Sequence, residues 1–213
     1  MLLLSTAYFP PIQYFSCILQ YQPAVVIERH EHYVRQSYRN RCAIYAAGGL
    51  LSLVVPVVKT DKPKTPVGEV EICYHAHWQK QHFKSIESAY RRSPFYEFYI
   101  DELMPFFNRR HPYLYEFNMN IMRAVCGLIN MPFSARESCR YVKPAEGIID
   151  LRNKIHPKTD FTISDYPTSN SLKSNSLTPP RYLQVFADRH GFKPGLSILD
   201  LLFNVGPRAV ELL

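Results

Sequence analysis

The pattern of apolar and polar positions predicts a strand, a helix and a second strand at the start of the chain. Residues 2–7 are mostly apolar and fit a short buried strand, and Pro11 suits the first turn of a helix that continues to Tyr21. The β-branched run over residues 24–28 indicates another strand. Because a helical crossover joins parallel strands, this order favours a Rossmann-like β-α-β unit.

Three further regions have patterns typical of strands. Residues 41–45 and 50–58 flank the sequence Ala46-Ala-Gly-Gly49 and predict a hairpin, because glycine tolerates the positive φ that a tight turn needs. Residues 67–74 alternate apolar and polar side chains, which predicts one more strand. Residues 137–142 are expected to return as a strand.

The apolar positions repeat with a helical period from His77 onward. They predict one helix from His77, a second that starts at Ser93-Pro94 and ends near Met104, and a third over residues 114–128. Short helices are expected over residues 181–190 and 197–203. Together the elements predict an α/β fold, with a single domain over residues 1–213, an open, mixed sheet and a helical C-terminal section.

The segment over residues 164–180 differs from the rest of the chain in composition. It is rich in Ser, Asn, Thr and Pro, which is typical of irregular structure. We therefore predict a flexible loop or lid there.

Composition narrows the classes of partner. The chain has 213 residues, 46% of them hydrophobic, which is enough to build a core. Lys and Arg number 25 against 18 Asp and Glu, a net charge of +7 that favours an anionic partner. The basic residues are dispersed and no nucleic-acid recognition module is present, so we expect no nucleic-acid partner. A small anionic substrate is expected instead, either a nucleotide sugar or a carboxylate or phosphate donor.

The sequence also indicates the cellular compartment in which the protein is expected. The N-terminus lacks the basic residue and the long apolar run of a signal peptide, and no apolar stretch approaches the length of a transmembrane helix. Five widely spaced cysteines, without any Cys-x-x-Cys motif, do not indicate a disulfide framework. We therefore expect a cytoplasmic protein without a transmembrane segment.

Several short motifs together resemble one known family. They are Tyr8-Phe-Pro-Pro-Ile-Gln-Tyr-Phe15, Tyr38-Arg-Asn-Arg-Cys42, Leu53-Val-Val-Pro56, Trp78-Gln-Lys-Gln-His82, Ser88-Ala-Tyr90 with Ser93-Pro-Phe-Tyr96, and Leu114-x-x-x-Asn118. This set resembles the WbqC-like protein family over about residues 3–130, and residues 181–206 are similar to the tail of one branch. The resemblance implies a role in bacterial O-antigen or other surface polysaccharide assembly, where transfer of an aminoacyl group to a sugar has been proposed.

The first turn, after the first strand, is a candidate binding loop. Phe9-x-Pro11-x-Gln13-x-Phe15 keeps the spacing of a nucleotidyltransferase loop but lacks its histidines and glycine. Without imidazoles the loop has no means of stabilising a departing pyrophosphate in that way. Tyr8, Gln13 and Tyr14 remain candidates for substrate binding, because open α/β sheets bind ligands at the carboxyl ends of their strands. The alternative is that Gln13 only satisfies the turn.

Arg39-Asn40-Arg41 is the densest basic cluster, with Arg29 and Arg35 nearby. In an extended segment Arg39 and Arg41 point to the same side and could clamp a phosphate or a carboxylate. The alternative is that these arginines pair with acids such as Glu28 or Glu31.

Histidines are the candidate general bases, because the imidazole pKa lies near neutral pH. We select His30 and His82 as catalytic candidates and His32 as a substrate-binding one. Trp78 is a candidate platform for stacking a sugar, or else a core residue. The pairs His30-x-His32 and His75-x-His77 lack a carboxylate partner at fixed spacing, so no metal is predicted, and no motif indicates a cofactor.

Two functions follow from these observations. The first is a transferase that places an aminoacyl (glycine-like) or acyl group on a nucleotide-activated sugar in O-antigen or surface polysaccharide biosynthesis. The alternative is a non-catalytic nucleotide- or sugar-binding protein, or a scaffold, with a degenerate nucleotidyltransferase-like fold. The absence of a recognisable nucleophile or Gly-rich phosphate loop in the sequence supports the alternative.

Overall fold

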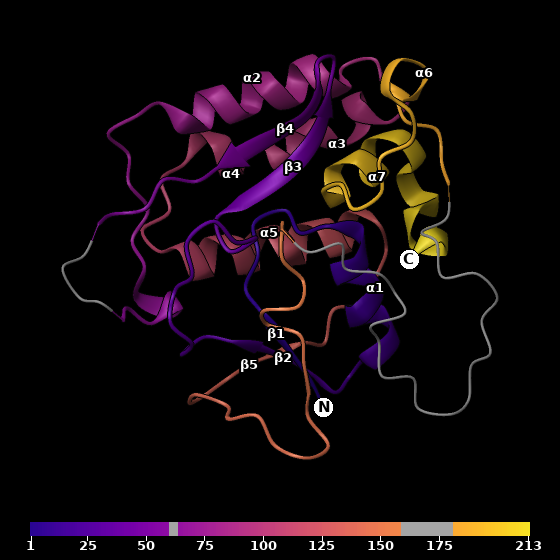
Figure 1. The fold of residues 1–213 in the computed structure, drawn as a ribbon. Coiled ribbons are helices and arrows are strands. Elements are labelled where there is room, and N and C mark those ends of the chain that lie inside the picture. The colour runs from indigo at the N-terminus through magenta and orange to yellow at the C-terminus, as the bar shows by residue number, and fades with distance from the viewer. Residues whose placement is uncertain (60–63, 159–180) are drawn as a thin grey trace.

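The strands form two separate sheets in the computed structural model, which describes residues 1–59, 64–158 and 181–213 (Figure 1). The first sheet has the order β5-β2-β1-β6, and all its pairings are parallel. Its strands are β1 (Leu2–Ser5), β2 (Val25–Glu28), β5 (Arg136–Glu137) and β6 (Ile149–Asp150). The second sheet is the antiparallel hairpin of β3 (Arg41–Ala46) and β4 (Gly49–Val54). The predicted α/β class is confirmed, with parallel and antiparallel strands in different sheets.

Strand β1 lies in the middle of the parallel sheet and is buried along its whole length. Helix α1 (Ile12–Tyr21) connects it to β2, as predicted for the β-α-β unit. On the other side β1 pairs with β6, through Leu2↔Ile149 and Leu3↔Asp150. The strand order therefore reverses between β1 and β6, and a reversal of this kind opens a crevice at the carboxyl ends of the strands.

The helices follow the apolar periodicity closely. Those after the hairpin are α2 (Trp78–Tyr90), α3 (Tyr96–Leu103), α4 (Pro105–Asn108), α5 (Leu114–Leu128), α6 (Ala187–His190) and α7 (Ile198–Val205). Pro105 begins α4 directly after α3, because proline fits the first helical position but not a helix interior. In Figure 1, α2 runs beside the hairpin and α7 lies beside β3, where the N–H of Ser197 donates to the carbonyl of Ala43.

One predicted strand is wrong and two predicted elements are shorter than expected. Residues 67–74 begin with a 3-10 helix (Val67–Glu69) and then form only isolated bridges at Glu71 and Ile72. The backbone N–H groups of Val67 and Gly68 donate to Glu31 and Arg29, which leaves no regular ladder to join. Over 137–142 only Glu137 is in a strand, because the N–H of Val142 donates to the side chain of Glu28. Over 181–190 only Ala187–His190 is helical.

One apolar cluster links the elements, from β1 through α5 to α7. The predicted lid over 164–180 lies outside the described residues. None of the helices in the described ranges combines the length and the apolar character that crossing a membrane requires.

Candidate functional site

The crevice between the carboxyl ends of β1 and β6 is nearly filled by protein. Residues after both strands line it, together with Tyr14, Tyr38 and Arg39. Its volume is about 10 Å³, which is room for about one water molecule. The hydroxyl of Tyr14 donates to the carbonyl of Ser5 at 2.5 Å, so this side chain stabilises the end of β1. The predicted binding role of Tyr14 therefore has no open cavity beside it among the described residues.

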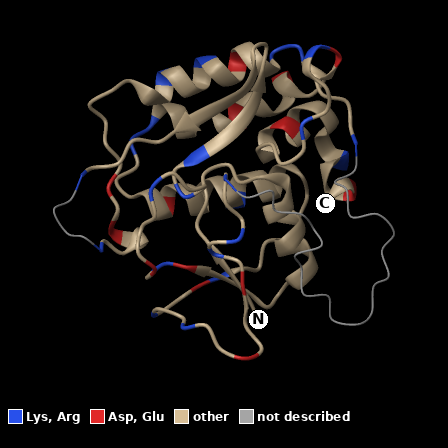
Figure 2. Cartoon of the chain, viewed as in Figure 1, with Lys and Arg blue, Asp and Glu red and all other residues tan. Residues whose placement is uncertain are grey.

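Charged residues gather around the parallel strands (Figure 2), and several of those beside this crevice are buried. Glu28 is wholly buried, and its carboxylate accepts hydrogen bonds from His30 N at 2.8 Å and Ser138 Oγ at 2.6 Å. Arg152 donates to Asp150 through Nε at 3.0 Å and Nη2 at 2.6 Å. Burial alone would raise the pKa of Asp150, but the hydrogen bonds from Arg152 lower it. These groups satisfy one another, which is typical of a structural network.

Arg39 belongs to the same buried network. Its Nε lies 2.9 Å from Oε1 of Glu31 and its Nη2 lies 2.6 Å from Oε2, a bidentate pair in which the side chains are 2% and 8% exposed. The guanidinium is therefore already occupied by a carboxylate. Arg29 is likewise paired, with Glu116 at 2.6 Å and with Glu137 at 3.3 Å.

Arg41 lies in a different cavity from Arg39. A cleft of about 360 Å³, which we call the Arg41 cleft, lies beside the start of β3. That volume falls within the range of about 300–1,000 Å³ typical of small-molecule sites. Its polar lining comprises Tyr33, Arg35, Gln36, Asn40, Arg41, Lys59 and Thr65, and no carboxylate is among the described residues that line it.

The cations of the Arg41 cleft are not neutralised by the protein. Arg35, Arg41 and Lys59 form no ion pair with any residue in the described ranges. Asn40 is buried and donates from Nδ2 to the carbonyl of Val55 at 2.8 Å. Its Oδ1 and the Nε of Arg41 are buried atoms without a hydrogen-bond partner in the described part of the chain. The cleft therefore offers three cations to a ligand, and two of its lining residues carry a buried polar atom that is unsatisfied among the described residues.

Tyr33 adds a neutral hydroxyl to this cleft. Burial raises the pKa of Tyr33 to about 12, although the positive charges of Arg35, Arg39 and Arg41 act in the opposite direction. The phenol therefore keeps its proton at neutral pH. Together with Asn40 it can provide hydrogen bonds of the kind that sugar hydroxyls form.

His82 lies in the aromatic core between α2 and the first turn. The Tyr8 hydroxyl lies 2.9 Å from its Nδ1, and the Trp78 ring is 5.1 Å away, edge to face. Burial lowers the pKa of His82 to about 4, against an opposing backbone hydrogen bond at Val54. All three side chains are buried, and none is among the residues that line the described cavities, so their surroundings favour a structural role.

The remaining predicted residues are dispersed. His30 is half-buried, with Nε2 at 3.2 Å from the carbonyl of Ser138. His32 is exposed and forms a bridge with Pro66. Gln13 is buried in the first turn of α1 and faces Gly195, in the C-terminal section. Among the described residues, no group of three or more His, Cys, Asp or Glu side chains is arranged to hold a metal ion.

The structure thus brings together Asn40 and Arg41 from the predicted set and separates them from Arg39. Sequence reasoning missed Lys59 and Gln36 as lining residues. The position of Lys59 in the sequence could have identified it. Lys59 follows the second strand of the hairpin and Arg41 begins the first strand, so the two residues lie at the same end of the hairpin.

Comparison with known proteins gives two findings. Residues 6–212 match the WbqC-like protein family. The chain is also 25% identical over 219 residues to "Uncharacterized protein Rv1507c" of Mycobacterium tuberculosis (strain ATCC 25618 / H37Rv), an alignment that covers 97% of this chain and 94% of that protein. No solved structure matches.

Proposed function

The chain belongs to the WbqC-like protein family, and from this membership we propose that it binds a nucleotide-activated sugar in the Arg41 cleft and transfers an aminoacyl or acyl group to it. The binding half rests on the geometry of the cleft. The transfer half rests on what the family resemblance implies for O-antigen and other surface polysaccharides. In this proposal the protein acts in the cytoplasm, where nucleotide-activated sugars are made.

One observation carries the binding proposal: three cations without an ion pair among the described residues share a cleft with a buried, half-satisfied amide. A guanidinium can bind two phosphate oxygens at once, so Arg41 and Arg35 suit a diphosphate, with Lys59 as a point charge. Asn40 Oδ1 accepts a hydrogen bond, which a sugar or ribose hydroxyl supplies. These groups support the proposed binding of a diphosphate and of a sugar or ribose hydroxyl.

His30 is the histidine that we propose as the general base. A neutral imidazole with its proton on Nε2 donates to the Ser138 carbonyl, and this hydrogen bond leaves the Nδ1 lone pair available. Nδ1 can then accept a proton from the amine or hydroxyl of the acceptor as that group attacks the carbonyl of an activated acyl donor such as a thioester, whose thiolate leaves. Because His30 is not among the residues that line the Arg41 cleft, this role requires the acceptor to extend beyond the cleft. His82 is the less suitable candidate, because its Nδ1 is engaged by Tyr8 and its ring is buried.

The non-catalytic alternative is favoured by one observation. No histidine or carboxylate is among the described residues that line the Arg41 cleft, so an acid–base pair is not in direct contact with that cavity. In this alternative the protein binds the nucleotide sugar for a neighbouring enzyme. Product formation separates the two, because binding is common to both and only a transferase forms a product.

A thermal-shift screen tests the binding step. The probes are UDP-glucose, UMP and glucose, each titrated onto the whole chain. We expect UDP-glucose to stabilise the protein, by about 2.7 kcal/mol at a concentration of 100 Kd, and glucose to have no effect. The same shift with glucose alone, or no shift with any of the three, would contradict binding through the phosphates.

His30→Ala and His82→Gln test the catalytic assignment once a donor and an acceptor support turnover. We expect His30→Ala to lower the rate about 100-fold or more without loss of UDP-glucose binding, as removal of a general base does. His82→Gln is the matched control and should keep the rate within a few-fold. Equal rates for His30→Ala and wild type would remove His30 from the mechanism.

A further inference from the structure

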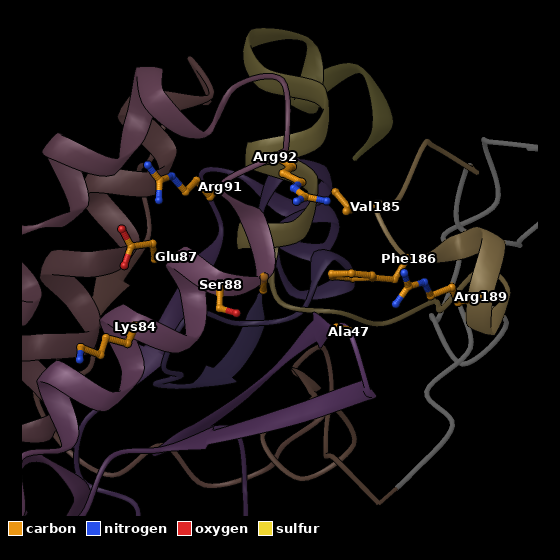
Figure 3. Close-up of a pocket in the computed structure, with 10 residues that line it drawn as sticks. Ala47, Lys84, Glu87, Ser88, Arg91, Arg92, Val185, Phe186 and Arg189 are labelled. Carbon is orange, nitrogen blue, oxygen red and sulfur yellow. The ribbon is translucent and has the colours of Figure 1, made fainter.

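A second and larger cleft lies at the other end of the β3–β4 hairpin, between the end of α2 and α6 (Figure 3). Its volume is about 710 Å³, against 360 Å³ for the Arg41 cleft. We call it the α2–α6 cleft, and its lining includes Lys84, Ser88, Arg91, Arg92, Phe186 and Arg189. Neither the family match nor the proposed function assigns it a role.

The lining of this cleft carries four cations and one carboxylate, that of Glu87. Lys84, Arg91, Arg92 and Arg189 form no ion pair with any residue in the described part of the chain. Figure 2 shows this concentration of basic residues where α2 ends and beside α6. Such an excess of unpaired positive charge around a concave surface favours an anion.

The side chains that line the α2–α6 cleft point in different directions. In Figure 3 those of Arg92, Phe186 and Arg189 point toward one another across the cleft, whereas those of Glu87 and Arg91 extend along the opposite side of α2. The two arginines come from different walls, one after α2 and the other within α6. A compact anion between them is therefore contacted from both sides, which a single basic helix face does not provide.

The wall that carries Phe186 and Arg189 is fixed to the hairpin. The hydroxyl of Tyr45, on β3, lies 3.0 Å from the carbonyl oxygen of Phe186 and 2.7 Å from that of Gly191. Nε2 of His190 lies 2.9 Å from the carbonyl oxygen of Ala47. Because these bonds hold the short helix in place before a ligand arrives, less ordering entropy is lost on binding.

Phe186 gives the cleft an aromatic surface beside the cations. The Tyr45 ring meets it edge to face, with centroids 5.8 Å apart and an angle of 66° between the planes. A ring held in this way is suited to stack on a planar group. From these contacts we propose that the α2–α6 cleft binds a nucleoside polyphosphate, with its phosphates between Arg92 and Arg189 and its base on Phe186.

This site is separate from the Arg41 cleft. Arg41 begins β3 and Ala47 follows its last residue, and at about 3.3 Å per residue the two ends of the strand lie about 17 Å apart. One nucleotide cannot place its phosphates at both ends of the strand. The α2–α6 cleft therefore binds a second ligand, whatever occupies the Arg41 cleft.

Calorimetric titration of the whole chain with ATP, pyrophosphate and adenosine, without divalent cations, tests the proposal. We expect ATP to bind more tightly than pyrophosphate and adenosine to bind weakest. In the double variant Arg92→Gln/Arg189→Gln the Kd for ATP should rise about 100-fold, near tenfold for each lost charged hydrogen bond. Arg109→Gln, an exposed arginine outside the cleft, is the matched control and should bind like wild type.

Two further variants make the result specific. Phe186→Ala should bind ATP no more tightly than pyrophosphate, and its retained pyrophosphate binding shows that it is folded. Arg41→Gln weakens any ATP binding at the Arg41 cleft and should keep the ATP site that the double variant loses, so that a failure of the proposed function remains distinguishable from a failure of this proposal. Unchanged ATP binding in the double variant, loss of it in Arg41→Gln, or equal affinity of the wild type for ATP and pyrophosphate would each overturn the assignment.

Discussion

The guanidinium of Arg39 is bound to the carboxylate of Glu31 by two hydrogen bonds, of 2.9 and 2.6 Å, and both side chains are buried. Arg41, two residues further along the chain, lines an open cleft instead. The basic cluster of the sequence is thus divided between a structural ion pair and a candidate binding site.

Arg39→Met should destabilise the fold strongly, by about 3–5 kcal/mol, because it leaves the Glu31 carboxylate buried without a partner. Replacing both residues, as Glu31→Met/Arg39→Met, should cost clearly less, since no charge then remains buried. Urea unfolding of the three proteins measures both effects. A single variant as stable as wild type would show that the ion pair is not structural.

His82 should make the protein sensitive to acid. Its pKa is about 4 in the folded state and 6.5 in the unfolded state, so below pH 6.5 the unfolded chain binds a proton that the folded chain excludes. This difference removes up to about 3 kcal/mol of stability as the pH falls from 6.5 to 4. Urea unfolding at pH 7 and pH 4.5 should show a smaller pH effect for His82→Gln, and an identical effect in both proteins would refute this role.

Asp200 should make the protein less stable as the pH rises, which is opposite to the effect of His82. Burial raises its pKa to about 6 against 3.8, although the hydroxyl of Tyr182 donates to its Oδ2 at 2.6 Å. The folded state holds a proton there that the unfolded state has lost, so about 3 kcal/mol of stability disappears as the pH rises from 3.8 to 6.

The isosteric change Asp200→Asn keeps the neutral shape at every pH. We expect this variant to gain stability relative to wild type at pH 7 and to lose that advantage at pH 4. Chemical denaturation at the two values is the measurement. An advantage that does not vary with pH would mean that Asp200 does not titrate in this range.

Gly206→Ala should be destabilising, because Gly206 has φ +67° and an added Cβ would lie 2.5 Å from Cδ1 of Phe95. The expected loss is about 1–3 kcal/mol in thermal or urea unfolding. Gly48→Ala is the matched control, since a Cβ there meets no atom within 4 Å, and it should change stability by less than about 0.5 kcal/mol. Equal effects of the two substitutions would contradict the close packing at Gly206.

The spacing of apolar residues was sufficient to predict the helices and strands whose own residues carry a regular pattern. The β-α-β unit, the hairpin and helices α2 and α5 all repeat their apolar positions in the chain itself. The alternation over 67–74 failed because its backbone donors are taken by Glu31 and Arg29, which lie far away in the sequence. The parallel strands β5 and β6 are two residues long, too short to have a pattern of their own.

The sites were predicted less completely, for a related reason. Asn40 and Arg41 stood out because they are adjacent in a basic cluster, but no spacing rule reveals that Glu31 neutralises Arg39. The α2–α6 cleft joins Arg92 and Arg189, which are brought together only by the folding of the C-terminal section onto the hairpin. A site whose residues lie far apart in the sequence, and outside any recognisable motif, produces no local sequence pattern that could predict it.

The central claim is that Arg41 and its neighbours bind the phosphates of a nucleotide-activated sugar. The most direct measurement is the calorimetric Kd for UDP-glucose of the wild type, of Arg41→Gln and of Arg92→Gln/Arg189→Gln, with Arg109→Gln as the exposed control. We predict that Arg41→Gln raises the Kd of one UDP-glucose site at least about tenfold, the loss of one charged hydrogen bond, that Arg92→Gln/Arg189→Gln keeps this site, and that Arg109→Gln binds like wild type. Wild-type affinity in Arg41→Gln would contradict the account.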